Sequence, residues 1–228
     1  GDILNTKMNL CKWEDLETEL NELKDRFNNN QKVIGPFPLL SLIDEPHLQK
    51  KASEMFSSFY YPKNDSYLNL NRYEKHERIR IGYFSADFKQ HPVATLTAEL
   101  YELHDRSQFE IHAFSFGPDT KDEMNLRIKA GVDFFHDVLN SSHEDIVNLA
   151  RFNEIDIAID LGGYTAKSRT EIFAMSVAAI QISYIGYLGT MGAEYYDYLI
   201  ADKVMIPEHN QKCYTEKIVY LPNFQVND

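Results

Sequence analysis

The sequence predicts an α/β protein in which a mostly parallel sheet is preceded by a small helical region. From residue 78 onward, short apolar runs alternate with helix-periodic segments and are separated by turns that contain glycine or proline. Before residue 78, apolar residues recur at three- and four-residue steps instead. Strands that alternate with helices favour βαβ units, and therefore strands that run parallel.

The first helical pattern covers residues 10–30, where Leu16, Leu20 and Leu23 share one face. Pro36 and Pro38 then predict a break. A second helix is expected to begin near residues 44–46 and to stop before residue 62. Residues 62–78 are polar and indicate a linker. We therefore expect a helical bridge region with its linker at 1–77 and a sheet domain at 78–228.

The sheet domain is expected to be Rossmann-like. Its predicted strands cover residues 79–85, 109–116, 134–138, 155–161, 178–185, 198–201 and 218–221. Helical patterns between the earlier strands cover residues 93–104, 122–130 and 143–153.

Composition and charge exclude several classes of function. The chain has 228 residues, 43% hydrophobic and 25% charged, and a net charge of 23 − 35 = −12. Such an acidic chain has no general attraction for nucleic acid or anionic lipid, and its most basic stretch, 75–80, is interrupted by Glu77. No run approaches the roughly 18 apolar residues of a membrane span, and the first residues do not resemble a signal peptide. We expect a cytoplasmic protein without nucleic-acid or membrane partners.

Metal and disulfide chemistry are not expected. The two cysteines, Cys11 and Cys213, lie at opposite ends of the chain, and the eight histidines are scattered. A disulfide is possible on paper, but two reduced thiols are the simpler interpretation. A zinc site would need clustered ligands that the sequence does not provide.

The loop after the first strand contains a carboxylate and an imidazole, Asp87 and His91. In an open α/β sheet, ligands bind at the carboxyl ends of the strands. The loop lacks the Gly-x-Gly-x-x-Gly pattern, which disfavours a nicotinamide or flavin enzyme. Histidine titrates near neutrality, so a nearby carboxylate could orient it as a base. Equally, Asp87 could turn the backbone and His91 could be an ordinary loop residue.

Two further loops are rich in glycine. Gly162, Gly163, Tyr164 and Thr165 follow the strand at 155–161, and residues 186–192 follow the strand at 178–185. Glycine allows a sugar or phosphate oxygen to approach backbone N–H groups, but any tight turn also needs it. Arg169 could hold an anion or could be a solvated surface residue. The sequence contains no nucleophile elbow, Walker loop or His-Glu-x-x-His pattern.

Taken together, these segments resemble a known family. The run Ile79-Arg80-Ile81-Gly82-Tyr83-Phe84-Ser85-Ala86-Asp87-Phe88 followed by His91-Pro92 is similar to the start of the catalytic region of the O-GlcNAc transferases and SPINDLY-type enzymes. The similarity continues through residues 160–165, Arg169, 180–181, 185–193, 197–202, 216–217 and 221–222. Upstream, residues 11–13 and 36–49 look like the bridge that follows the tetratricopeptide repeats in bacterial members.

The resemblance implies the N-terminal lobe of a GT-B fold and an inverting transfer from a nucleotide sugar to Ser or Thr of a protein acceptor. UDP-GlcNAc is the expected donor, and neither a cofactor nor a metal is required. His91 and Asp87 match the residues discussed as catalytic, although a donor phosphate could take the proton instead. The expected donor-cleft residues are Gly163, Tyr164, Thr165, Arg169, Gly186, Tyr187, Leu188, Gly189 and Thr190.

Some positions depart from the family pattern. Leu188 replaces a common proline, Val93 a small hydroxyl residue, and Phe37 a histidine of animal members, so a bacterial-type member is expected. The length also departs, because the chain offers one lobe where a GT-B enzyme has two, and it lacks the repeats. We therefore expect a fragment that is inactive alone. The alternatives are a non-catalytic protein-interaction module that keeps the fold, and an unrelated Rossmann enzyme.

Overall fold

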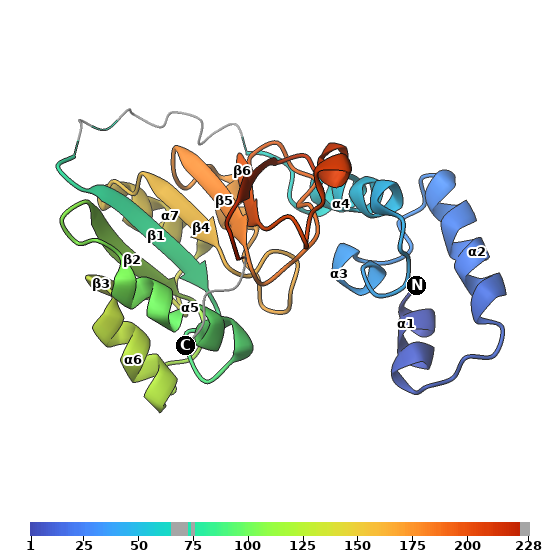
Figure 1. Cartoon of the computed structure of the whole chain (residues 1–228), viewed down its shortest axis with the longest axis horizontal. Helices are drawn as coiled ribbons and strands as arrows, with labels where there is room; N and C mark the ends of the chain where they lie inside the picture. The colour runs from blue at the N-terminus through green and yellow to red at the C-terminus, as the bar shows by residue number, and fades with distance from the viewer. Residues whose placement is uncertain (65–72, 74–75, 224–228) are drawn as a thin grey trace.

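The computed structural model describes residues 1–64, 73 and 76–223, and within them it shows a parallel α/β sheet with an attached helical region (Figure 1). All strand pairs are parallel. The strands are β1 (Ile79–Ser85), β2 (Phe109–Ser115), β3 (Phe134–Asp137), β4 (Ile157–Asp160), β5 (Ile180–Tyr184), β6 (Tyr198–Ala201) and β7 (Lys217–Tyr220). The predicted fold class is confirmed, and each expected strand is present within about two residues of its predicted limits.

The strand order is β3-β2-β1-β4-β5-β6-β7. The chain moves outward from β1 to β3, returns to the other side of β1, and then moves outward again. The order therefore reverses between β1 and β4, where Phe84 pairs with Asp160 near the carboxyl ends of both strands. This topological switch point is where open α/β sheets place their ligands.

Helices cover both faces of the sheet. The helices α5 (Pro92–Leu103) and α6 (Glu123–Gly131) pack on one face, and α7 (His143–Phe152) and α8 (Glu171–Ala174) pack on the other. In Figure 1, α5 and α6 lie in front of β1–β3 and α7 lies behind the sheet. Side chains alternate along a strand, so Tyr83 joins the core beneath α5 whereas Phe84 joins the core beneath α7.

The helical region differs from the predicted pattern. It contains α1 (Asp2–Asn9), α2 (Leu16–Asn28), α3 (Pro36–Leu39) and α4 (Pro46–Tyr60). The single helix expected over 10–30 is wrong at its start, because Cys11 and Asp15 adopt left-handed φ angles of 54° and 58° and turn the chain between α1 and α2. The prolines near residue 36 begin a helical turn as well as interrupting the pattern, since proline is tolerated in a first turn. The start of α4 is as predicted.

The helical region packs directly on the sheet domain. Ser57 Oγ in α4 donates to the Gly192 carbonyl at 2.6 Å, and Tyr195 Oη donates to the Tyr61 carbonyl at 3.0 Å. A 3-10 helix, η2 (Glu208–Cys213), also contacts α4. Most of the linker predicted at 62–78 lies outside the described residues.

Cys11 is exposed, Cys213 is buried, and neither forms a disulfide. Among the helices that the structure describes, none has both the length and the apolar character needed to cross a membrane.

Candidate functional site

The candidate site lies at the carboxyl ends of β1, β4 and β5, which are neighbouring strands on the two sides of the switch point. Three loops meet this edge, and they cover residues 86–91, 161–170 and 185–192. These are the loops that the sequence singles out, so the topology brings them to one edge of the sheet.

Asp87 and His91 lie close together in the first loop. His91 is the N-cap of α5, and its Nδ1 accepts from the Val93 N–H at 3.3 Å. Asp87 Oδ2 lies 3.7 Å from the same Nδ1, and the other carboxylate oxygen lies 3.8 Å from Lys89 Nζ. The His91 side chain is 38% exposed whereas that of Asp87 is 18% exposed. The imidazole is thus accessible, and a carboxylate lies behind it.

The single Nδ1 atom has two possible partners, and it cannot serve both in one tautomer. When Nδ1 accepts from Val93, the neutral ring carries its proton on Nε2 and offers a donor to a ligand. When Nδ1 carries the proton and faces Asp87, Nε2 is free to act as a base. For His91 to act as a base, its Nδ1 must therefore give up the bond from the Val93 N–H and carry a proton that faces the Asp87 carboxylate.

Asp160 fixes the backbone of the second loop through hydrogen bonds. This carboxylate is 3% exposed. Its Oδ1 accepts from the Gly162 and Gly163 N–H groups at 2.9 and 3.0 Å, and its Oδ2 accepts from Tyr196 Oη at 2.5 Å. Burial raises the pKa of Asp160 above its usual value, while the three donors act in the opposite direction. Sequence reasoning did not select Asp160; an acidic residue ending an apolar strand was the available signal.

Glu216 likewise fixes the third loop through hydrogen bonds. It is 4% exposed and accepts from Thr190 Oγ1 and from the Met191 N–H, both at 2.6 Å. Thr190 Oγ1 also accepts from the Gly192 N–H at 3.1 Å. Burial raises the pKa of Glu216. Thr190 is therefore a buried structural hydroxyl, held by a residue that the sequence places only next to the last strand.

The glycines of these loops permit close packing of neighbouring segments. A side chain at Gly186 would meet the Leu161 carbonyl oxygen at 2.0 Å, and one at Gly189 would meet Tyr187 Oη at 2.5 Å. Gly163 has a φ of 56°, and a side chain there would meet Tyr187 Cβ at 2.5 Å. Of the two interpretations open from the sequence, tight turns account for these glycines without a ligand.

The other expected cleft residues are placed as follows. Tyr164 is buried and donates to the Met191 carbonyl at 2.6 Å, and Tyr187 is buried with Oη 3.3 Å from Ser53 Oγ of α4. Thr165 Oγ1 donates to the Gly162 carbonyl at 2.7 Å. Leu188 is 46% exposed. Within the loop at 185–192, Leu188 is thus the large side chain that faces outward.

Arg169 is occupied by protein groups. Its guanidinium donates to the Ser141 and Leu139 carbonyls at 2.7 and 2.8 Å and lies over the Phe116 ring at 5.6 Å. These contacts tie the second loop to the loop before α7. An anion at Arg169 would compete with both carbonyls.

Surface hollows lie beside two of the loops. One is lined by Phe37 and Pro38 of the helical region and by Ile185, Gly186 and Leu188 of the third loop. A second lies against His91, Thr95 and Leu96. Both hollows are lined by loops at the carboxyl edge of the sheet, and the second one gives access to the imidazole.

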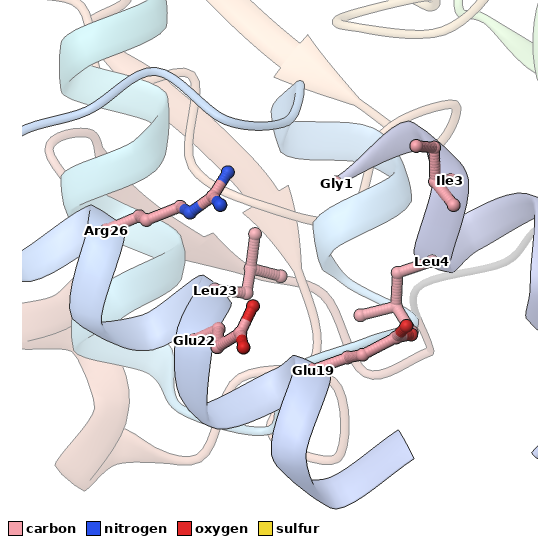
Figure 2. A pocket seen from close by; sticks show the side chains of 7 residues that line it. All are labelled: Gly1, Ile3, Leu4, Glu19, Glu22, Leu23 and Arg26. Atoms are coloured by element: carbon pink, nitrogen blue, oxygen red, sulfur yellow. The ribbon is translucent and has the colours of Figure 1, made fainter. Parts of the chain in front are cut away.

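A separate hollow lies between α1 and α2, where Glu19, Glu22 and Arg26 of α2 surround Leu4 and Leu23 (Figure 2). Glu19 is paired there with Lys7. This hollow belongs to the helical region and contains none of the expected site residues. Across the described part of the chain, no three His, Cys, Asp or Glu side chains are grouped to hold a metal ion.

Comparison with known proteins identifies relatives of the segment that contains these loops. The family model described as Glycosyl transferase family 41 matches residues 57–228, which include all three. A probable UDP-N-acetylglucosamine–peptide N-acetylglucosaminyltransferase, SEC of Arabidopsis thaliana, is 33% identical over 99% of this chain and 25% of its own length. The similarly named SPINDLY protein of Oryza sativa is 30% identical over 62% of this chain and 16% of its own.

A solved structure, a mutant O-GlcNAc transferase of Thermobaculum terrenum, superposes with a TM-score of 0.70 at 26% identity. The superposition covers 79% of this chain and 35% of the other. The chain therefore spans about a quarter to a third of the SEC protein and of the solved structure.

Proposed function

The chain belongs to glycosyltransferase family 41, with the O-GlcNAc transferases and SPINDLY-type enzymes, and from this we propose that it is the acceptor-side lobe of a protein O-glycosyltransferase. The proposed reaction transfers N-acetylglucosamine from UDP-GlcNAc to a serine or threonine hydroxyl with inversion at the anomeric carbon. The names of the plant relatives, which specify this donor and a peptide acceptor, support the choice.

The observation that carries the proposal is the position of Asp87 and His91. They lie at the carboxyl end of β1, at the switch point, inside the segment that the family model matches. An accessible imidazole beside a carboxylate can act as a general base once Nδ1 exchanges its bond from the Val93 N–H for the Asp87 carboxylate. The hollow next to His91 gives a hydroxyl group room to approach the imidazole.

In the proposed step, the acceptor oxygen attacks the anomeric carbon as the bond to the nucleotide diphosphate breaks. The hydroxyl proton passes to His91 Nε2, with Nδ1–H then facing Asp87, or to a phosphate oxygen of the donor. In the second case His91 Nδ1 continues to accept from the Val93 N–H, and its Nε2–H group donates to a ligand. The step balances with a proton acceptor and a diphosphate leaving group, and its independence of a metal is part of the proposal, taken from the family resemblance.

We propose that the nucleotide is held mainly by a second lobe. The chain carries a net charge of −12. The N–H groups of Gly162, Gly163 and Met191 are used within the loops, and Arg169 is used on carbonyls. Because they are used in this way, these groups are not available to a diphosphate.

The acceptor would approach along the groove between the helical region and the third loop. Phe37 and Leu188 are 49% and 46% exposed on opposite sides of this groove. Exposed apolar side chains of this kind would offer contacts to an acceptor peptide, whose reactive hydroxyl would have to reach His91.

The experiment is transfer by the full-length protein with a panel of labelled nucleotide sugars that includes UDP-GlcNAc and GDP-fucose. Transfer from UDP-GlcNAc to a protein acceptor, in excess of donor hydrolysis, is expected. Transfer from another donor would correct the sugar. Acceptor binding without transfer from any donor would contradict the proposal and favour the non-catalytic interaction module.

A further inference from the structure

The first turn of α6 holds the loop that carries Asp87 and His91. Asn125 is 1% exposed, and its Nδ2 donates to the Phe88 carbonyl at 2.7 Å. Asp122, the N-cap of α6, accepts from the Gln90 N–H through Oδ2 at 3.0 Å. Two polar side chains more than 30 residues downstream thus bind the backbone on both sides of Lys89.

The remaining bonds of the loop show why these two contacts matter. The Asp87 N–H donates to Ser85 Oγ at 2.9 Å, and the Lys89 N–H donates to the Asp87 carbonyl at 2.8 Å. These bonds are local and fix each residue only to its near neighbours. The contacts at Phe88 and Gln90 instead connect the loop to another helix, and so they set where it lies.

Asp122 is itself well fixed, and the Asn125 backbone is bonded to it. Asp122 Oδ1 accepts from the Asn125 N–H at 2.8 Å, and Oδ2 also accepts from Thr120 Oγ1 at 2.6 Å. The bond from the Gln90 backbone, with these others, lowers the pKa of Asp122, so the carboxylate is charged at neutral pH. The buried Phe88 ring packs on Tyr101 and Phe135, which resists rotation of the same peptide.

We propose that Asp122 and Asn125 are positioning residues for the site. They hold the backbone at Phe88 and Gln90 so that the Asp87 carboxylate remains beside the His91 ring, although neither residue reaches the hollow at His91. This inference rests on the proposed function of that loop. It adds two residues that no motif in the sequence marks, because their link to the loop is made only by the fold.

The test compares three variants in the full-length protein. Asp122→Ala removes the acceptor for Gln90, and Asn125→Ala removes the donor to Phe88. Asp122→Asn keeps one oxygen, which can accept from either the Gln90 N–H or the Asn125 N–H but not from both as the carboxylate does, and it serves as a partial rescue. Ala130→Gly is the matched control, because it weakens α6 at an exposed position near its other end.

The measurements are kcat and KM for donor and acceptor per folded molecule, and the melting temperature. In the 228-residue chain, hydrogen exchange at the Gln90 amide is also measured.

Misplaced catalytic groups lower the rate of the chemical step, so both alanine variants should lose about tenfold or more in kcat with little change in donor KM. The Gln90 amide should exchange faster in Asp122→Ala, and Asp122→Asn should recover part of kcat. Ala130→Gly should lower the melting temperature without this loss of kcat.

Parental kcat in both alanine variants, or an equal loss of kcat in Ala130→Gly, would overturn the positioning role. His91→Ala is the reference. If it retains parental kcat, the role of the loop in the proposed function fails and the positioning role fails with it. The two failures can be told apart. If only the positioning role fails, His91→Ala still shows its large loss of kcat.

Discussion

Asp160 is the residue whose environment makes the sharpest stability prediction. Replacement by alanine would leave the Tyr196 hydroxyl and the N–H groups of Gly162 and Gly163 buried without their acceptor. Since a buried unpaired donor costs about 1–3 kcal/mol, we expect Asp160→Ala to lower the free energy of unfolding by about 3 kcal/mol or more.

Asp160→Asn is the matched control for this prediction. Its oxygen can still accept from the two glycines, and its amide can donate to Tyr196, so the expected loss is about 1 kcal/mol or less. Urea unfolding of both variants checks the difference. Equal losses would show that the network does not depend on an acceptor at this position.

Two stacked histidines on neighbouring strands predict a pH dependence of stability. His112 Nδ1 lies 3.0 Å from His136 Nε2, and burial lowers the pKa of both rings, that of His136 to about 4. Unfolded histidine titrates near 6.5. The unfolded chain therefore binds more protons as the pH falls below about 6.5, and the stability should decrease from there towards pH 4.

The variant His136→Phe checks this interpretation, since phenylalanine keeps the ring stack and removes one titrating group. The loss of stability between pH 7 and pH 5 should be smaller in the variant. Some dependence should remain from His112 and from His104, whose pKa burial also lowers to about 4. An unchanged dependence would exclude His136 as one of its sources.

At the scale of single residues, the sequence identifies candidate site residues but does not show which of them matter most. Asp87 and His91 are selected because they follow a strand and have useful chemistry, and their catalytic role stays a prediction. Asp160 and Glu216 are missed because their importance comes from burial, and Asp122 and Asn125 because their partners are far away in sequence. Arg169 is identified, but its partners, two carbonyls of another loop, follow only from the fold.

Among the elements, the contact between α4 and the third loop depends on one glycine. Gly192 has a φ of 61°, and a side chain there would lie 2.4 Å from the Glu54 nitrogen and 2.5 Å from the Ser53 carbonyl carbon, both backbone atoms of α4. We expect Gly192→Ala to destabilise the protein by more than about 1 kcal/mol, because both the backbone angle and the space oppose it.

Hydrogen exchange along α4 measures where this destabilisation falls. Amides of α4 should lose protection in Gly192→Ala more than amides of α7 do. Gly162→Ala is the control, because its nearest neighbours would be at 3.5 Å or more. Protection of α4 equal to that of the parent would contradict the idea that this glycine sets the distance between helix and loop.

The elements themselves are largely predictable, because period-two and helical patterns mark the buried strands and α4–α7. The helices α1 and α2 are less predictable from the sequence. Leu10 and Trp13 fit the helical spacing but are 62% and 53% exposed in the turn between α1 and α2. A pattern of apolar residues cannot distinguish a buried face from an exposed turn.

For the whole molecule, we predict weak binding of nucleotide sugars by the 228-residue chain alone. The chain is acidic, and the loop N–H groups that suit a diphosphate are used internally. Isothermal titration with UDP-GlcNAc should give a much weaker affinity for the chain than for the full-length protein. Micromolar binding by the chain alone would contradict the proposed division between two lobes.

The central claim is that the loop between β1 and α5 performs the transfer chemistry, and His91→Ala in the full-length protein tests it most directly. With UDP-GlcNAc and a protein acceptor, kcat per folded molecule should fall by about 100-fold or more, as expected for the loss of a general base. A near-parental kcat, with an unchanged melting temperature, would show that His91 is only the cap of α5 and that the chemistry lies elsewhere.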